Sequence, residues 1–221
     1  MKRKIVFAPG QFYHLYNRGV EKRDIFLEPR DYSRFMDYMY FCNDTKSVDI
    51  RRIKELDKGP SFVGRENMVG ILCYCLMPNH FHLLLSPMHE DGIVRFMRKL
   101  STGYAMYFNE KYQRTGILFQ GRYKATLIDN EGYLMHLTRY IHLNPLNLCF
   151  PEWKEKGVKN WEVSEKFLRE YMWSSYNSYI YKKNMCDILN MKLIENHIDM
   201  QLGEKYEEFI KGWIPEITDK G

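Results

Sequence analysis

The segment that most restricts the fold is a pair of apolar stretches joined by two residues. "MVGILCYCLM" covers residues 68–77, "PN" follows, and "HFHLLLS" covers residues 80–86. A Pro-Asn pair between two apolar runs is typical of a tight connection between antiparallel strands. Both runs are apolar on both faces, so we expect two central strands in a sheet that is covered on both sides.

The remaining elements are arranged around this hairpin. "QFYHLYNRG" predicts a strand that runs into a turn, and large apolar residues recur at helical spacing between Tyr32 and Tyr40. We further expect a helix over residues 91–111, a strand over 122–129, and a helix from its N-cap Asn130 to about Asn144, where Pro145 stops it. The order β-α-β-β-α-β-α predicts an α+β fold with a ferredoxin-like, split βαβ antiparallel sheet and helices on its faces.

Two segments fall outside this pattern. Residues 44–67 are highly charged and contain Gly and Pro, which predicts a surface excursion with a short helix around Ile50–Leu56. Beyond Leu148 the sequence is more polar and holds short helical pieces. We therefore expect one domain over residues 1–148 and a C-terminal helical appendage over residues 149–221, packed on the same unit.

Composition excludes several classes of protein. A net charge of +5 permits a polyanionic partner without requiring one. The five cysteines are an odd, scattered set, which favours reduced thiols. The N-terminal apolar stretch is too short for a signal peptide, and no segment approaches the ~18 apolar residues of a membrane span. We expect a cytoplasmic protein with no membrane partner.

The sequence "HFH" places two imidazoles in one strand. Because side chains alternate along a strand, His80 and His82 share a face and Phe81 points to the other. Two imidazoles whose Cα atoms are ~6.6 Å apart can bind one metal ion. The alternative is that one histidine is buried and hydrogen-bonded and the other lies at the solvent-exposed end of the strand. The pattern His-x-His by itself does not decide between a metal site and this alternative.

A second polar group lies on the helix expected to start at Asn130. Its core stripe consists of Leu134, Leu137, Thr138 and Ile141, and beside this stripe lie Tyr133, His136, Tyr140 and Asn144. If this helix packs on the histidine face, a phenol and an amide oxygen reach the two imidazoles. With seventeen tyrosines in the chain, ordinary packing remains an alternative for the phenol.

Five motifs in this order carry a family resemblance: "YHLYNRG", "CYCLMPNHFHLLLSP", "GILFQGRYKATLID", "YLMHLTRYIHLNPL" and "YMWSSYNSY". Together they resemble the REP-associated tyrosine transposases, single-tyrosine HUH nucleases of the insertion-sequence-200 type. The resemblance covers residues 12–179 and implies the HUH nuclease fold, a divalent metal, and a tyrosine nucleophile acting on single-stranded DNA. By motif, His80 and His82 match the metal-binding pair and Tyr140 the nucleophile. Asn144, four residues after the tyrosine, matches the third ligand, where the well-known insertion-sequence enzymes have Gln.

Such a site would suit Mg²⁺ or Mn²⁺. Two neutral imidazoles and an amide oxygen leave coordination positions open for phosphate oxygens and water. Attack by Tyr140 would leave a 5′-phosphotyrosine and a free 3′-OH. The 3′-OH of a second strand could then reverse this step and join the strands without ATP. His136 is a conceivable proton acceptor, although simple packing explains it as well.

The expected partner is single-stranded or hairpin DNA, bound by a monomer or a homodimer. The candidate phosphate-binding residues are Arg18, Arg95, Arg98, Lys99, Arg122 and Lys124. One alternative function is a non-catalytic module that binds single-stranded or hairpin nucleic acid. A structural or hydrolytic zinc protein is a third possibility, but acidic or cysteine ligands near the histidine pair are not evident.

Overall fold

The computed structural model describes residues 5–46, 65–158, 160–184, 187–198 and 202–212. Within these ranges, a four-stranded sheet has the order β2-β3-β1-β4, and every neighbouring pair is antiparallel. The strands are β1 (Phe12–Arg18), β2 (Val69–Met77), β3 (His80–Pro87) and β4 (Lys124–Ile128). This arrangement confirms the predicted α+β, ferredoxin-like sheet.

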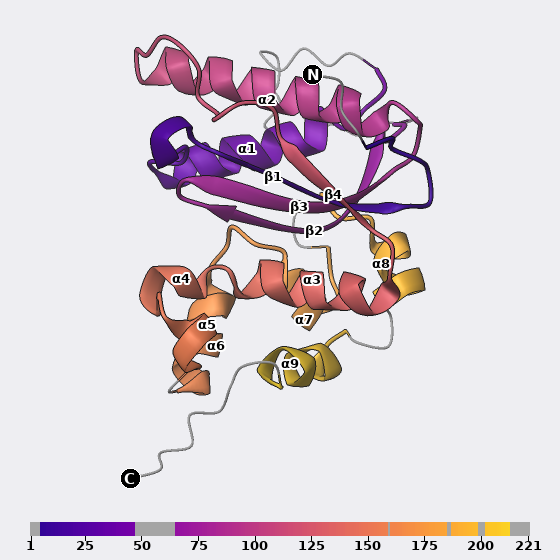
Figure 1. The fold of residues 1–221 in the computed structure, drawn as a ribbon, viewed down its shortest axis with the longest axis vertical. Coiled ribbons are helices and arrows are strands. Elements are labelled where there is room, and N and C mark those ends of the chain that lie inside the picture. Colours follow the sequence, from indigo (N-terminus) through magenta and orange to yellow (C-terminus); the bar gives the residue numbers. More distant parts are fainter. Residues whose placement is uncertain (1–4, 47–64, 159, 185–186, 199–201, 213–221) are drawn as a thin grey trace.

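Helices cover both faces of the sheet (Figure 1). Helices α1 (Pro29–Phe41) and α2 (Gly92–Lys111) lie on one face, and α3 (Glu131–Leu143) lies on the other. The C-terminal helices are α4 (Leu146–Cys149), α5 (Trp153–Lys156), α6 (Trp161–Glu170), α7 (Tyr176–Ile180), α8 (Met191–Ile198) and α9 (Glu204–Lys211), and a 3-10 turn, η1 (Val20–Lys22), follows β1. From β1 to α3 the strands and α-helices follow the predicted order β-α-β-β-α-β-α. The C-terminal helices gather on the α3 side (Figure 1).

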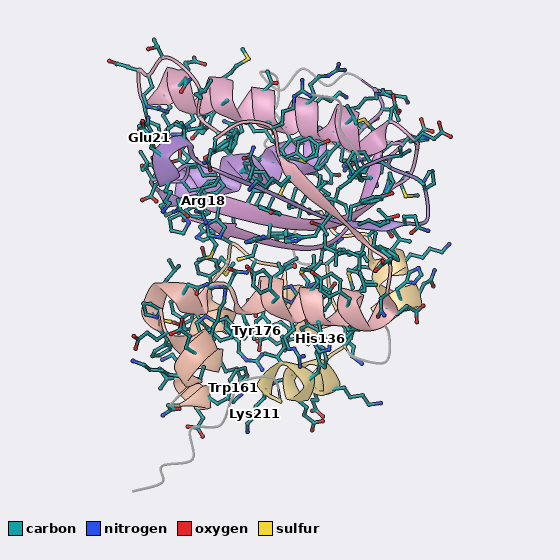
Figure 2. The ribbon with its side chains drawn as sticks, in the orientation of Figure 1. Arg18, Glu21, His136, Trp161, Tyr176 and Lys211 are labelled. Carbon is teal, nitrogen blue, oxygen red and sulfur yellow. The ribbon has the colours of Figure 1, made fainter. Side chains whose placement is uncertain are left out.

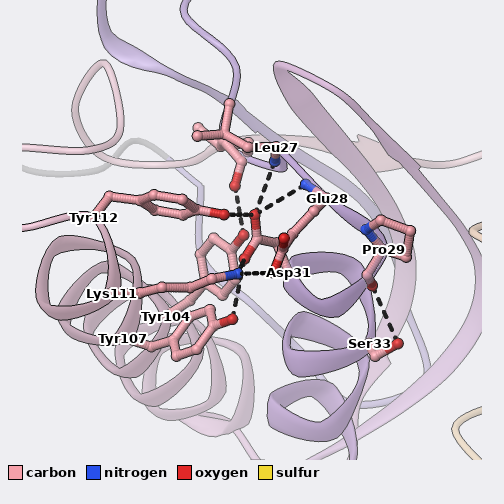
Figure 3. Close-up of polar contacts among 10 residues, drawn as sticks. Leu27, Glu28, Pro29, Asp31, Ser33, Tyr104, Tyr107, Lys111 and Tyr112 are labelled. Atoms are coloured by element: carbon pink, nitrogen blue, oxygen red, sulfur yellow. Dashed lines mark hydrogen bonds and ion pairs between the residues drawn. The ribbon is translucent and has the colours of Figure 1, made fainter.

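The first helical layer is anchored by one buried carboxylate (Figure 3). Asp31, in the first turn of α1, accepts hydrogen bonds from the backbone amides of Leu27 and Glu28, and it also pairs with Lys111 and the hydroxyls of Tyr107 and Tyr112 at the end of α2. Burial by itself raises the pKa of this carboxyl, but the hydrogen bonds, that of Lys111 first, hold the pKa below its usual value. The beginning of α1 is thereby tied to the end of α2.

Strand β2 lies at the edge of the sheet, so the prediction of two central strands was wrong for this strand. All of its residues are nevertheless buried. The backbone of the C-terminal region covers the edge: the Leu76 amide donates to the Trp173 carbonyl (2.9 Å), the Ser175 amide to Tyr74 (3.0 Å), and the Asn190 amide to Ile71 (2.8 Å). An edge strand satisfied in this way can have the composition of a central one.

The C-terminal helices also share the main hydrophobic core. Leu168, Tyr176 and Tyr206 are fully buried in the same cluster as the sheet residues. The boundary at residue 148 remains a prediction. Within the described ranges, no helix combines the length and apolarity that crossing a bilayer requires.

Two further predictions concern the connecting segments. Asp44 and Asn67 form an isolated bridge at the base of the charged excursion, and the helix expected around Ile50–Leu56 lies outside the described residues. Pro145 ends α3 as predicted, although Asn144 keeps a right-handed helical conformation and the chain enters α4 directly. The Asn144 amide bonds to the Ile141 carbonyl, three residues back, so the last turn tightens rather than unwinds.

Candidate functional site: a cavity between the sheet and α3

A cavity of about 810 Å³ lies between the sheet and α3. Arg18 belongs to the sheet and His136 to α3, the two layers that enclose it (Figure 2). Its wall consists of His14, Tyr16, Asn17, Arg18, His80, His82, Gln120, Arg122, Lys124, Thr126, Tyr133, His136, Leu137 and Tyr140. Most of these side chains are polar or basic, which suits a charged ligand more than an apolar one.

The strand alternation predicted for "HFH" is confirmed. His82 faces α3, because its ring lies 5.7 Å from that of Tyr140, centroid to centroid. Phe81 faces the other layer, where its ring lies 5.0 Å from that of Phe35 in α1. His80 and His82 therefore point together into the cavity, as the period of a strand requires.

Both histidines use one ring nitrogen and leave the other without a hydrogen bond in the described part of the chain. His80 Nδ1 lies 2.5 Å from Asn79 Oδ1, and the Asn79 amide nitrogen donates to the Lys22 carbonyl. An amide oxygen only accepts, so His80 Nδ1 carries the proton and Nε2 keeps its lone pair. His82 Nδ1 lies 2.9 Å from His14 Nε2, and donation from His82 to His14 would free His82 Nε2 in the same way.

Burial keeps this histidine group neutral. It lowers the pKa of His14 and of His80 to about 4. The pKa of His82 is held well below its usual value by burial first and then by its histidine neighbours and by Lys154 and Arg18. Neutral imidazoles at pH 7 are the form that binds metal ions.

Tyr140 reaches the cavity because α3 packs as its sequence period predicts. Asn130 caps the helix by accepting a hydrogen bond from the Tyr133 amide at 3.1 Å. The predicted core stripe, Leu134, Leu137, Thr138 and Ile141, is buried against the sheet. Tyr140 lies beside this stripe, half-buried, with its ring edge-on to His82. A phenol and two imidazoles thus meet in one cavity.

The remaining two polar residues of that helix differ in placement. His136 lines the cavity, and its Nδ1 contacts the guanidinium of Arg139. Asn144 is 2% exposed and lies outside the cavity wall. Its amide nitrogen donates to the Tyr140 carbonyl at 2.9 Å, and its amide oxygen accepts from Asn147 at 3.3 Å. The structure therefore brings His80, His82 and Tyr140 together without the amide of Asn144.

The predicted basic residues divide into two groups. Arg18, Arg122 and Lys124 line the cavity. Arg95, Arg98 and Lys99 lie on α2, which covers the opposite face of the sheet (Figure 1). Arg95 and Lys99 donate to the carbonyls of Thr45 and Asp44, at 3.2 and 2.7 Å, and so hold the base of the charged excursion. The six side chains do not form one surface.

Sequence reasoning missed two residues near the site. His14 shares a strand face with Tyr16 and Arg18, a period-two signal that pointed to it once Arg18 was selected. Lys154, in α5, holds its ammonium 4.7 Å from the centre of the Tyr140 ring. No local pattern marks Lys154, because its position depends on how the chain folds back after α3. Among the described residues, no cluster of three or more His, Cys, Asp or Glu side chains forms a metal site.

Known proteins support the resemblance read from the sequence. Residues 39–144 match the family model described as "Transposase IS200 like". A solved structure of a REP-associated tyrosine transposase bound to a REP hairpin covers 82% of this chain and 86% of its own, with a TM-score of 0.51 and 14% identity. At that identity the likeness shows a shared fold.

A second solved structure is described as a putative transposase from Deinococcus radiodurans, with 15% identity, 64% of this chain and 95% of that chain covered. Its TM-score of 0.36 is too low to support an argument. No curated protein matches the chain. The segment at residues 39–144, which carries both cavity histidines and Tyr140, is similar to the IS200-like transposases.

Proposed function

We propose that this protein is a metal-dependent enzyme that cleaves single-stranded DNA and transfers the cut strand through a 5′-phosphotyrosine. The observation that carries the proposal is the meeting of His80, His82 and Tyr140 in one cavity whose wall also holds Arg18, Arg122 and Lys124. A nucleophile, two ligand nitrogens and cationic side chains are the parts that phosphodiester transfer requires.

The donor set fits a divalent ion. His80 and His82 would hold Mg²⁺ or Mn²⁺ through Nε2, because each Nδ1 already has a partner. When bound, the ion neutralises charge on the scissile phosphate. Asn144 remains a proposed third ligand, and its amide oxygen must give up the bond from Asn147 to act as one.

The reaction proposed for Tyr140 conserves the number of phosphodiester bonds. The phenolic oxygen attacks phosphorus, the bond from phosphorus to the 3′-oxygen breaks, and that oxygen leaves as a 3′-OH after taking up a proton. Because phenol has a pKa near ~10, Tyr140 needs a proton acceptor or a positive field at neutral pH. His136 lies on the same wall and is the candidate acceptor, and its Nδ1 must give up the contact with the Arg139 guanidinium to act as one.

The partner proposed is single-stranded or hairpin DNA. Arg18, Arg122 and Lys124 would bind its phosphates, and the rings of Tyr16 and Tyr133 on the same wall would stack on unpaired bases. The solved relative of similar fold is bound to a REP hairpin, which supports DNA of this kind. The assembly proposed for the reaction is a monomer or a homodimer.

The test is a denaturing gel of the protein with end-labelled, fragmented single-stranded DNA and Mn²⁺. We expect a slowly migrating covalent adduct, whose DNA can be sequenced to give the cleavage site. Tyr140→Phe removes one oxygen and almost no volume, so it should abolish the adduct while DNA binding survives. Tyr133→Phe, on the same wall, is the control and should stay within about tenfold of the unmodified protein.

Two outcomes would change the proposal. An adduct that persists in the Tyr140 variant would mean that a different tyrosine attacks. Binding without an adduct, over a broad pool of DNA with Mn²⁺ present, would favour a non-catalytic module that holds single-stranded or hairpin nucleic acid.

A further inference from the structure

The segment after α3 folds back and places the ammonium of Lys154 beside the candidate nucleophile, Tyr140. We propose that Lys154 is a further catalytic residue, whose ammonium binds a non-bridging oxygen of the scissile phosphate beside Tyr140. This inference rests on the function proposed above. It adds to the reaction a residue that lies outside the segment at 39–144 that matches the family model.

The position of Lys154 is the first observation. Its Nζ lies 4.7 Å from the centre of the Tyr140 ring, and the Tyr140 ring is edge-on to His82. The His82 ring lies 5.7 Å from the Tyr140 ring, centroid to centroid, and 5.1 Å from the His80 ring. A phosphate held between the histidine pair and the phenol would therefore lie within reach of this cation.

The second observation is that Lys154 has no carboxylate partner among the described residues. Its neighbour in α5, Lys156, pairs with Glu152 at 2.5 Å. Lys154 is instead exposed and makes cation–π contacts with Tyr140 and, at 5.6 Å, with Trp153. Partial burial lowers the pKa of its ammonium. An exposed cation held without an anion is available to a phosphate.

The third observation is that hydrogen bonds hold the segment just before Lys154 against the end of α3. The Asn147 amide nitrogen donates to the Asn144 carbonyl at 2.8 Å, and Asn144 in turn donates to Tyr140. The indole nitrogen of Trp153 donates to the Asn147 amide oxygen at 3.2 Å, and Trp153 is 2% exposed. The backbone that precedes Lys154 is thereby anchored to the end of α3.

This geometry suits stabilisation of charge. Negative charge grows on the non-bridging oxygens as the phenolic oxygen bonds to phosphorus, and a cation already held beside them needs little reorganisation. Lys154 keeps its proton throughout, so the proton acceptor for Tyr140 is a separate group. A lysine ammonium acts on a phosphate as a point charge.

The first measurement does not require cleavage. A fluorescein-labelled single strand is bound to Tyr140→Phe, with and without Lys154→Ala, and its affinity is followed by anisotropy over a range of salt concentrations. Loss of one phosphate contact should lower the log–log salt slope by about 0.7. Lys156→Ala is the matched control, since it changes a neighbouring lysine that already has a carboxylate partner, and its slope should not change.

The second measurement is the rate of adduct formation at saturating DNA and Mn²⁺. Lys154→Ala should form the adduct about 10²-fold more slowly than the unmodified protein, Lys156→Ala should match it, and Lys154→Arg should recover part of the rate. Circular dichroism melts of all variants establish that each is folded.

The outcomes separate the two proposals. An unchanged salt slope in Lys154→Ala overturns the phosphate contact, even if the adduct forms slowly, because Lys154 would then act only through Tyr140. A reduced slope with slower adduct formation supports the inference. A reduced slope with no adduct in any protein, the unmodified one included, supports the phosphate contact and rejects the strand transfer.

Discussion

Two groups of histidines lie on the α3 side of the sheet, and they differ in what their ring nitrogens contact. In the open group, His80 and His82 use Nδ1 for Asn79 and His14, and Nε2 makes no hydrogen bond within the described residues. In the closed group, His142 contacts the Tyr206 hydroxyl through Nδ1 at 2.6 Å and the Ser175 hydroxyl through Nε2 at 2.7 Å. Cys73 Sγ lies 3.2 Å from the same Nε2.

Burial does not distinguish the two groups, but the free lone pair does. His82 is 6% exposed and His142 is fully buried, and burial lowers the pKa of both rings. His142 joins α3 to β2 and to the C-terminal helices, so its contacts hold the fold together. The open group has unused ligand capacity that faces a cavity. We therefore expect substitutions of His80 or His82 to remove activity and substitution of His142 to lower stability.

The largest expected effect is on the reaction. His80→Ala and His82→Ala should each reduce Mn²⁺-dependent adduct formation to background, because each change removes one of the two ligand nitrogens proposed to hold the ion. The free energy of unfolding should change by about 1–2 kcal/mol, since each change removes one hydrogen bond. Gel assays and urea titrations measure the two quantities.

Phe81→Ala is the control for this pair, because Phe81 faces the opposite layer. It should lower the free energy of unfolding by about 3–5 kcal/mol and leave the reaction of the folded protein intact. If the histidine variants unfolded while the Phe81 variant stayed stable, the assignment of activity to the histidine face and of stability to the Phe81 face would be reversed.

The next effect is on stability. His142→Ala removes the shared partner of Tyr206 and Ser175 and leaves a cavity, which should lower the free energy of unfolding by about 2–4 kcal/mol. Adduct formation per folded molecule should persist. Unchanged urea midpoints, or an active-site defect in a fully folded variant, would contradict the structural role of this histidine.

A smaller effect is expected at His14, whose Nε2 contacts Nδ1 of His82 in the open group. His14→Phe keeps a ring and removes the partner of His82 Nδ1, so the Mn²⁺ concentration for half-maximal adduct formation should rise about 10–100-fold. Excess Mn²⁺ should restore the rate. Tyr16→Phe, on the same strand face, is the control, and equal Mn²⁺ titrations for both variants would argue against the orienting role.

The last prediction concerns how stability depends on pH, where the effect within any one pH unit is small. Burial lowers the pKa of His142 from 6.5 to about 3. Between pH 6.5 and pH 3 His142 is therefore protonated in the unfolded chain and neutral in the folded protein. The free energy of unfolding is unaffected by this group above pH 6.5 and decreases as the pH falls toward 3. His142→Gln should reduce the slope of unfolding free energy against pH in this window by up to about 1.4 kcal/mol per unit. Identical slopes in the two proteins would mean that folding does not lower the pKa of this ring.

The sequence by itself determined the parts of the site that depend on local periodicity. A period of two put His80 and His82 on one face and Phe81 on the other, and the structure agrees. A helical period put Tyr140 beside the buried stripe that begins at Leu134, and the Asn130 cap marked where that helix starts. These features follow from backbone geometry within one element, so neighbouring residues suffice to predict them.

The tertiary structure decided everything that depends on contacts between distant segments. The order of the strands places β2 at the edge, and residues near Ser175 cover it, which the apolar composition of β2 could not reveal. The same packing turns the Asn144 amide toward Asn147, puts Lys99 on the far face, and returns Lys154 to Tyr140. Periodicity specifies the face on which a side chain lies, whereas long-range packing specifies what lies opposite that face.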